Sequence, residues 1–243
     1  MGKAKIGLGV IGVNATNMGS TVSLLKDVPD LRYDLRAICA ARPEPLAALA
    51  REWGVPFHST DYRALVERPD IDVVAIYSPD HLHAEHCRAA LAAGKHVICT
   101  KPMVTSLEDA RDLVQAVRRS GKKFLVGQTM RFDRQFLTLR QFFERGDLGK
   151  LRVAQAHYVH DMRPIYQFTP WRLEVPQDLM YGGIVHVADI LRSFCGDVAE
   201  VHAFANHGTL TPSYPFEDNY LLNLRFENGV IGQGVGLYGL VRQ

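Results

Sequence analysis

The sequence lacks the features that mark membrane proteins and nucleic-acid-binding proteins. Among its 243 residues, no apolar run reaches the ~18 residues that a helix needs to span a bilayer. The 28 Lys and Arg residues are balanced by 26 Asp and Glu residues and are mixed with them along the chain. No block of one charge therefore presents a surface to nucleic acid or to an anionic membrane. These absences argue against both partners and favour a small molecule.

Cysteine is also scarce. The four cysteines are widely spaced and form no C-x-x-C pair, which argues against a disulfide framework and against a metal site. Most of them lie inside apolar runs, so we expect all four to be reduced and buried. The N-terminus enters a strand pattern at once, without the small-residue cleavage site of a signal peptide. The expected location is the cytoplasm.

Short apolar runs alternate with helical patterns through the first half of the chain. Buried strands are predicted at 5–12, 35–40, 73–78, 96–100 and 123–128, with helices around 20–26, 43–53, 81–93 and 106–119. Continuous runs of Val, Ile and Leu are typical of strands buried on both faces, and their alternation with helices indicates parallel βαβ crossovers. The predicted fold class is α/β, with a doubly wound parallel sheet of the Rossmann type.

The pattern changes after about residue 130. A helix is predicted at 132–145, and residues 151–160 alternate apolar and polar side chains like a strand buried on one face. A helix at 183–194 and a strand near 198–206 follow, and Asn228-Gly229 is a strong signal for a hairpin turn. We therefore expect two domains, residues 1–126 and residues 127–243, the second with an α+β architecture and a mainly antiparallel sheet.

A literal G-x-G-x-x-G is present at Gly7, Gly9 and Gly12, but the first two glycines fall inside the predicted strand. A pyrophosphate approaches backbone N–H groups where the strand gives way to a helix, so the following turn is the relevant segment. That turn reads G-x-N-x-x-N. By itself the motif does not distinguish a dinucleotide loop from a plain turn capped by Asn or Thr. The residues assigned to a dinucleotide in this loop are Gly12, Asn14, Ala15, Thr16, Asn17 and Met18.

The end of the second predicted strand bears on which dinucleotide is bound. An acidic residue at this place normally binds the adenosine ribose of NAD, but the sequence reads Ala40-Ala41-Arg42. No carboxylate would repel a 2′-phosphate, and a guanidinium can bind one in bidentate fashion. Ala41 and Arg42 therefore favour NADP, with NAD as the alternative. A solvated loop arginine would give the same pattern.

The segment Ser78-Pro79-Asp80-His81-Leu82-His83, followed by AALAAGKHVICTKPMVTSLEDARDLV, resembles the Gfo/Idh/MocA family of oxidoreductases, which act on sugars, polyols and related alcohols. The resemblance continues through V-G-Q-x-x-R-F-D and a later H-x-x-D. It implies hydride transfer to or from a nicotinamide, with the dinucleotide in the first domain and the substrate in the second. The further residues assigned to the cofactor are Ser78, Pro79, Asp80, His83, Lys101, Pro102 and Gln128.

The resemblance implies two catalytic residues, Lys101 and His186. Lys101 lies in a Thr100-Lys101-Pro102 turn where the family has Glu-Lys-Pro, and its ammonium could stabilise a developing alkoxide. Without the resemblance, a surface lysine before an ordinary proline turn would be preferred. His186 aligns with a histidine suited to exchange the proton of an alcohol, while Gly182 stands where the family has Asp. Without the family context, a lone histidine on an apolar helix face would be read as a core residue.

A sugar-like substrate is expected to lie against both catalytic residues and their neighbours. Asp189 falls three residues after His186 and could orient its ring or bind substrate hydroxyls. Strand alternation sends only some of His157, Tyr158 and His160 toward the substrate. The residues assigned to the substrate are Lys101, Arg131, Asp189, His186 and Tyr158, and no metal site is predicted.

Three functions stay open. The leading one is an NADP-linked oxidoreductase that acts on a sugar, cyclitol or related polyol. A dinucleotide-binding sensor or regulator without catalysis is favoured by the changed glycines, Thr100 and Gly182, whereas the retention of Lys101 and His186 favours an enzyme. The third is a reductase of the same fold that acts on a non-sugar carbonyl or imine.

The family's second domain ordinarily carries a larger antiparallel sheet than residues 127–243 can supply. We therefore expect this domain to be shortened or incomplete. A bare strand edge and sheet face would call for a partner subunit. The expected assembly is a homo-oligomer, a dimer or tetramer, formed through the C-terminal sheet.

Overall fold

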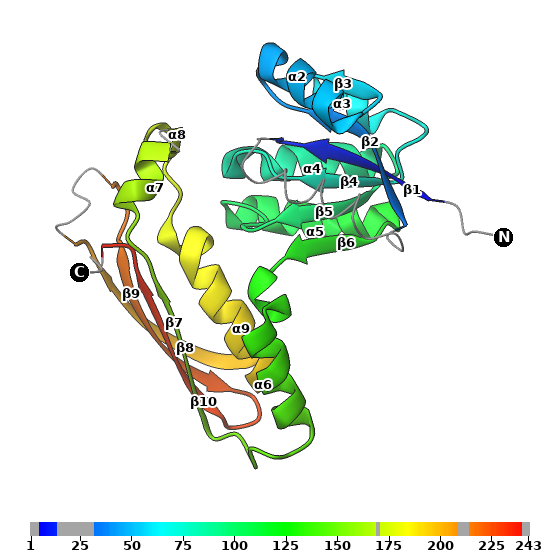
Figure 1. Cartoon of the computed structure of the whole chain (residues 1–243). Coiled ribbons are helices and arrows are strands. Elements are labelled where there is room, and N and C mark those ends of the chain that lie inside the picture. Colours follow the sequence, from blue (N-terminus) through cyan, green and yellow to red (C-terminus); the bar gives the residue numbers. More distant parts are fainter. Residues whose placement is uncertain (1–4, 14–31, 169–170, 209–213, 240–243) are drawn as a thin grey trace. The chain divides into compact units, whose positions relative to one another are not determined.

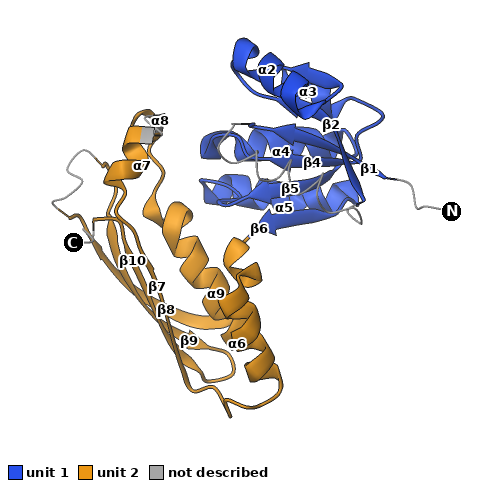
Figure 2. Ribbon diagram, viewed as in Figure 1, with its two compact units in different colours: residues 1–127 blue, residues 128–243 orange. Residues whose placement is uncertain are grey.

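The computed structural model describes residues 5–13, 32–168, 171–208 and 214–239. It divides into two compact units, residues 1–127 and residues 128–243 (Figure 2). The boundary expected from the sequence falls after residue 126. The predicted helix at 20–26 and the loop residues Asn14, Ala15, Thr16, Asn17 and Met18 lie outside the described residues.

In the described part of unit 1, the apolar runs form a six-stranded parallel sheet in the order β3-β2-β1-β4-β5-β6 (Figure 1). The strand order reverses at β1, which places a topological switch point between β1 and β4. This confirms the predicted doubly wound fold. The strands are β1 (Ile6–Ile11), β2 (Tyr33–Cys39), β3 (Phe57–Ser59), β4 (Val73–Ile76), β5 (His96–Thr100) and β6 (Phe124–Gly127). The helices are α2 (Pro43–Trp53), α3 (Tyr62–Val66), α4 (His83–Ala92) and α5 (Leu107–Ser120), with a 3-10 turn η1 at Asp80–Leu82.

Helices cover both faces of this sheet because the strands alternate their side chains between two apolar clusters. Leu8 and Val10 of β1 pack in the cluster that includes Leu46 of α2. Ile11 packs in the cluster that includes Leu65 of α3 and Leu113 of α5. Strands buried on both sides explain why the sequence shows continuous apolar runs rather than alternation.

Two sequence-based interpretations concern residues inside these strands. Gly7 and Gly9 lie within β1, as expected, and a Cβ atom on Gly7 would overlap the carbonyl oxygen of Asp70. The first glycines of the apparent motif therefore serve close packing. The four cysteines all fall in the described ranges and are free and buried, which confirms that expectation.

In the described part of unit 2, helices pack on one face of a four-stranded sheet in the order β7-β10-β9-β8. β9 pairs antiparallel with β8 and β10, while β7 and β10 are parallel, so the sheet is mixed and mainly antiparallel, as predicted. The strands are β7 (Val153–Val159), β8 (Val198–Asn206), β9 (Asn219–Phe226) and β10 (Ile231–Leu237). The helices are α6 (Arg134–Glu144), α7 (Arg163–Phe168), α8 (Trp171–Glu174) and α9 (Val185–Cys195), with a 3-10 turn η2 (Thr129–Phe132) and a π-helical turn η3 (Met180–Ile184).

The β9–β10 hairpin fixes the register of this sheet. Gly229 has a φ of 83°, a left-handed conformation that glycine adopts without strain, and the Asn228 side chain accepts a hydrogen bond from the Val230 N–H (3.1 Å). The hairpin predicted from Asn228-Gly229 is therefore confirmed. Figure 1 shows α6 and α9 on one face of the sheet, where Leu222, Leu224 and Phe226 are buried.

No helix within the described ranges is both long enough and apolar enough to span a membrane.

Candidate functional site

The carboxyl ends of β1 and β4 approach each other closely in unit 1. Gly12, directly after β1, has a φ of 92°, and a Cβ atom on it would overlap the backbone at Tyr77 and Ser78. Only glycine satisfies both conditions. Gly12 therefore brings the turn that follows β1 against the turn that follows β4, at the switch point where doubly wound sheets bind ligands.

The turn after β4 is held by buried polar contacts. Ser78 and Asp80 are both buried, and the Ser78 hydroxyl lies 2.8 Å from Nδ1 of His86. Pro79 precedes the 3-10 turn η1, which leads into α4. Ser78, Pro79 and Asp80, which the sequence assigned to the cofactor, thus lie together in one turn.

Lys101 stands at the carboxyl end of β5, the strand next to β4. It is half-buried and is joined to Pro102 by a cis peptide bond. The carbonyl oxygen of Pro102 lies 2.6 Å from Nδ1 of His83, and the other ring nitrogen of His83 lies 2.8 Å from the carbonyl oxygen of Ser78. Unit 1 therefore collects Gly12, the Ser78 turn and the Lys101 turn at one edge of its sheet.

His83 lies in the interior of unit 1. The sequence assigned it to the cofactor, but its side chain has no exposed surface and faces two backbone carbonyl groups. Burial lowers the pKa of His83, but hydrogen bonding to Cys99 and to the two carbonyl groups outweighs burial and raises the pKa to about 9. The side chain can serve the cofactor site only through the backbone that it holds.

The adenosine end of the expected site lies at the end of β2. Ala41 and Arg42 are exposed there, and Arg42 occupies the N-cap position of α2 without using its side chain as a cap. A carboxylate is nearby: Asp61 caps α3 and, together with the larger effect of burial, raises the pKa of Cys39 to about 11. This end of the sheet therefore presents an exposed Arg42, while the Asp61 carboxylate accepts the backbone N–H of Arg63.

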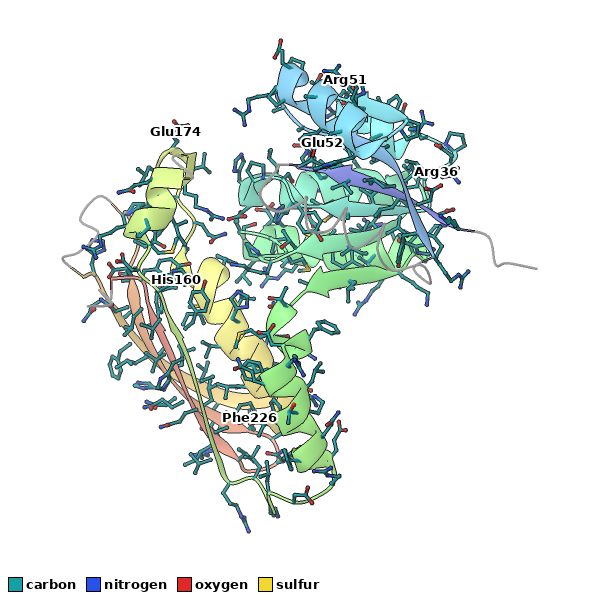
Figure 3. All side chains as sticks on the ribbon, viewed as in Figure 1. Arg36, Arg51, Glu52, His160, Glu174 and Phe226 are labelled. Carbon is teal, nitrogen blue, oxygen red and sulfur yellow. The ribbon has the colours of Figure 1, made fainter. Side chains whose placement is uncertain are left out.

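In unit 2, His186 lies in the first turn of α9 and is buried. Its ring stacks on Tyr158 with a centroid distance of 5.1 Å and an interplanar angle of 18°. Tyr158 stacks in turn with His160, which is labelled in Figure 3, at 5.8 Å. His157 belongs to the exposed face of β7, so the strand directs Tyr158 and His160, but not His157, to this group.

Two glycines before His186 make room for neighbouring side chains, of which Gln177 and Tyr238 were not predicted from the sequence. A Cβ atom on Gly183 would lie 2.7 Å from Cδ1 of Tyr158, and one on Gly182 would overlap the Gln177 carboxamide and the Tyr238 hydroxyl. An Asp at position 182, as the resemblance implied, would not fit here unless these groups moved. The Gly182-Gly183 pair was the available signal, because adjacent glycines in a helix indicate close packing.

Arg131 and Asp189, both assigned to the substrate, bind each other. The guanidinium donates two hydrogen bonds to the two carboxylate oxygens, at 2.6 and 2.7 Å. This bidentate pair joins η2 to α9 and further raises the pKa of Arg131. Asp189 therefore fixes the plane of the Arg131 guanidinium, and about half of the Arg131 side chain stays exposed.

Gln128 begins unit 2, and its side-chain oxygen is buried without a hydrogen-bond partner among the described residues. Buried amide oxygens are normally paired, so this atom fits a site that is completed by a donor from a ligand.

Among the residues that the structure describes, no group of three or more His, Cys, Asp or Glu side chains could hold a metal ion.

Comparisons with known proteins identify the family. Residues 6–128 match the oxidoreductase family with an NAD-binding Rossmann fold, and residues 136–236 match the GFO/IDH/MocA C-terminal domain. The chain belongs to the Gfo/Idh/MocA oxidoreductase family. The resemblance carried by Ser78–Pro102 is thereby confirmed.

Several relatives of this Gfo/Idh/MocA protein are named as enzymes that act on sugars or cyclitols. The 1,5-anhydro-D-fructose reductase of Ensifer adhaerens is 33% identical over 192 residues, which cover 77% of this chain and 56% of the relative. The myo-inositol 2-dehydrogenase of Thermotoga maritima is 28% identical, with 93% of this chain and 65% of the relative covered. A solved structure of levoglucosan dehydrogenase in complex with NADH and L-sorbose has a TM-score of 0.82 and 27% identity, with 98% of this chain and 68% of that chain covered. The chain thus spans little more than half the length of the first of these relatives.

Proposed function

We propose that this Gfo/Idh/MocA protein is an NADP(H)-dependent oxidoreductase that transfers hydride between nicotinamide and a hydroxyl or keto carbon of a sugar, cyclitol or related polyol. The observation that carries the proposal is the edge of the unit 1 sheet where Gly12, the Ser78 turn and Lys101 are held together. The named activities of the relatives supply the substrate class.

The residues present fit such a cofactor. Gly12 lies at the switch point of the sheet, and Gln128 offers a buried oxygen without a partner in the described residues. When bound, the nicotinamide would supply the hydride acceptor or donor that no side chain can replace. Pro79, Asp80 and Pro102 border the place proposed for its nicotinamide end.

The chain's own residues would handle the substrate oxygen and its proton. Lys101 would donate a hydrogen bond from its ammonium group to the reacting oxygen and stabilise the alkoxide that develops there. His186 would take the hydroxyl proton on its imidazole during oxidation and return it during reduction. Tyr158 would hold the imidazole plane by stacking, and Arg131 would bind substrate hydroxyls with the guanidinium that Asp189 fixes.

Replacement of Lys101 by Ala tests this mechanism. Turnover of the polyol that the wild type oxidises should fall about 10²- to 10³-fold, which is the usual effect of removing one hydrogen-bond donor from a developing oxyanion. Cofactor affinity should be largely unchanged. The measurement is absorbance of the reduced nicotinamide over a panel of sugars and cyclitols. Lys123→Ala, a change at an exposed lysine before β6, is the matched control and should leave turnover intact. An unimpaired Lys101→Ala enzyme would contradict the assignment.

The preference for NADP rests on Arg42, whose exposed guanidinium stands where a carboxylate would select NAD. We expect NADPH to bind more tightly than NADH in a fluorescence titration. Arg42→Ala should weaken NADPH binding about 10-fold or more and leave NADH unaffected, because it removes charge-assisted hydrogen bonds to the 2′-phosphate. Equal affinities in the wild type would contradict the preference for NADP.

A non-catalytic sensor of the same fold is the second candidate. It is favoured by Gly182, because the surrounding side chains occupy the space that an Asp would need. Cofactor binding without turnover on any polyol, non-sugar carbonyl or imine would support the sensor. Turnover on a carbonyl or imine alone would instead support the third alternative.

Two further proposals concern the oligomeric state of the protein and its location in the cell. The outer face of the unit 2 sheet carries exposed apolar side chains, including Phe204 and Leu221, and we infer that it forms a homo-oligomer interface. The four free, buried cysteines suit a reducing compartment such as the cytoplasm.

A further inference from the structure

His83 connects the two turns of unit 1 that matter most for the proposed function. It is the first residue of α4, and its ring lies between the end of β4 and the turn after β5. Nε2 lies 2.8 Å from the carbonyl oxygen of Ser78, and Nδ1 lies 2.6 Å from the carbonyl oxygen of Pro102. These two turns are separated in sequence but are joined through one fully buried side chain.

The chemistry of these contacts specifies histidine in its charged form. Carbonyl oxygens only accept hydrogen bonds, so both ring nitrogens must donate, and only the doubly protonated imidazole has two N–H groups on opposite sides of a ring. Asn and Gln carry both of their donor hydrogens on one nitrogen. They cannot reach carbonyl groups on two sides in this way.

Several groups around the ring carry or share charge. The Cys99 sulfur from β5 interacts with His83 and favours its charged form, which raises the pKa of His83. Cys87 of α4 hydrogen-bonds to Cys99 and is the main cause of its lowered pKa, and Asp80 of η1 acts on the same sulfur. His86, one turn along α4, opposes the charge, but burial holds its own pKa below the usual value.

We propose that His83 is a positioning residue, whose two ring N–H groups hold the backbone of the Ser78 turn against the backbone of the Lys101-Pro102 turn. This inference rests on the proposed function, in which the first turn borders the nicotinamide and the second carries the ammonium that holds the reacting oxygen. Lys101 immediately precedes Pro102, so fixing the Pro102 carbonyl group fixes the backbone from which Lys101 extends. His83 itself touches neither cofactor nor substrate, because its ring has no exposed surface.

The direct test uses the wild-type protein and needs no turnover. NMR of the protein labelled with 15N-histidine should show one ring with two slowly exchanging N–H protons at pH 8, where an ordinary histidine is neutral. This signal should be missing from His83→Gln. A neutral ring with a single N–H proton in the wild type at pH 7 would overturn the proposal.

Hydrogen exchange distinguishes a clamp from a general packing role. In His83→Gln, backbone amides at residues 78–82 and 101–104 should exchange faster, while the rest of unit 1 keeps its protection. The control is His96→Gln. His96 also binds backbone, accepting the Lys123 N–H at 2.9 Å, but it lies at the opposite end of β5 and should leave both turns unchanged. Faster exchange throughout unit 1 in His83→Gln would contradict a local clamp.

Kinetics then link the clamp to the reaction. The kcat of His83→Gln, normalised to bound cofactor, should fall about 10- to 100-fold, because displacement of a catalytic group by ~1 Å can cost 10²-fold. The KM for the polyol should change less than about threefold, since Arg131 and His186 are untouched. An unchanged kcat with both turns loosened would overturn the positioning role. If the wild type turns over no polyol, the proposed function fails, and NMR and hydrogen exchange still decide whether His83 holds the two turns.

Discussion

At the scale of single residues, the packing of the candidate site in unit 2 depends on the absence of a side chain at position 182. Gly182 lies four residues before His186, and the Gln177 carboxamide and Tyr238 hydroxyl occupy the space where a side chain would begin. Tyr238 is buried, and desolvation raises the pKa of its hydroxyl well above the usual value, so this group stays protonated and can donate. The polar atoms at position 182 therefore come from Gln177, five residues earlier, and from Tyr238, far along the chain.

This packing predicts a specific pattern of stability. Gly182→Ala should lower the free energy of unfolding of unit 2 by about 1–3 kcal/mol, because the added methyl group overlaps both side chains. Combining it with Gln177→Ala and Tyr238→Phe, which remove the overlapping atoms, should recover part of that loss. Denaturant unfolding of the wild type, Gly182→Ala, the Gln177→Ala/Tyr238→Phe double variant and the triple variant measures the coupling between position 182 and these two side chains. Strictly additive effects would mean that these contacts do not limit position 182.

At the scale of secondary-structure elements, periodicity predicted the long elements well and the short ones poorly. The helix expected at 43–53 is α2 at Pro43–Trp53, because Pro43 and Gly54 mark its ends. The short elements β3, α3, α7 and α8 were not predicted, since three to six residues carry too little periodicity. The helix expected at 183–194 begins instead with the π-helical turn η3, where Gly182 and Gly183 allow close packing.

Strand β1 gives a prediction at this scale, because its glycines form a motif without being a phosphate loop. Gly7→Ala should lower the free energy of unfolding by about 1–3 kcal/mol, since its Cβ overlaps the backbone of Asp70. The folded fraction should bind the cofactor with unchanged affinity. In Gly127→Ala, the matched control in β6, the nearest contacts would lie at an ordinary 3.5 Å, so its unfolding should change by less than about 1 kcal/mol. Weaker cofactor binding by folded Gly7→Ala would restore the motif as a functional one.

At the scale of the whole molecule, the exposed face of the unit 2 sheet determines the expected assembly. Phe204 of β8 and Leu221 of β9 are directly opposite each other and are 65% and 49% exposed. Val153 and Ile231 form a second exposed apolar pair on β7 and β10, level with Arg225 rather than with Leu221 of β9. Apolar side chains gathered on one sheet face are typical of a protein–protein interface.

Light scattering tests this interface. The wild type should be a dimer or tetramer, and Leu221→Glu combined with Phe204→Glu should give monomers with an unchanged circular dichroism spectrum, because buried charges oppose association. Leu107→Glu, which places the same charge at an exposed leucine at the start of α5, is the control and should remain oligomeric. A monomeric wild type would remove the basis for the proposed interface.

The sequence by itself determined the parallel sheet of unit 1, the Asn228-Gly229 hairpin and the family, because periodicity, turn chemistry and the Ser78–Pro102 motif are local properties of the chain. It also named Lys101 and His186, whose roles stay predictions. Only the tertiary structure decided that Arg131 binds Asp189 across 58 positions of sequence and that the His83 ring is buried between the carbonyl groups of Ser78 and Pro102. The physical reason is that a polar side chain finds its partner through long-range packing, and neither hydropathy nor spacing encodes which donor will meet which acceptor.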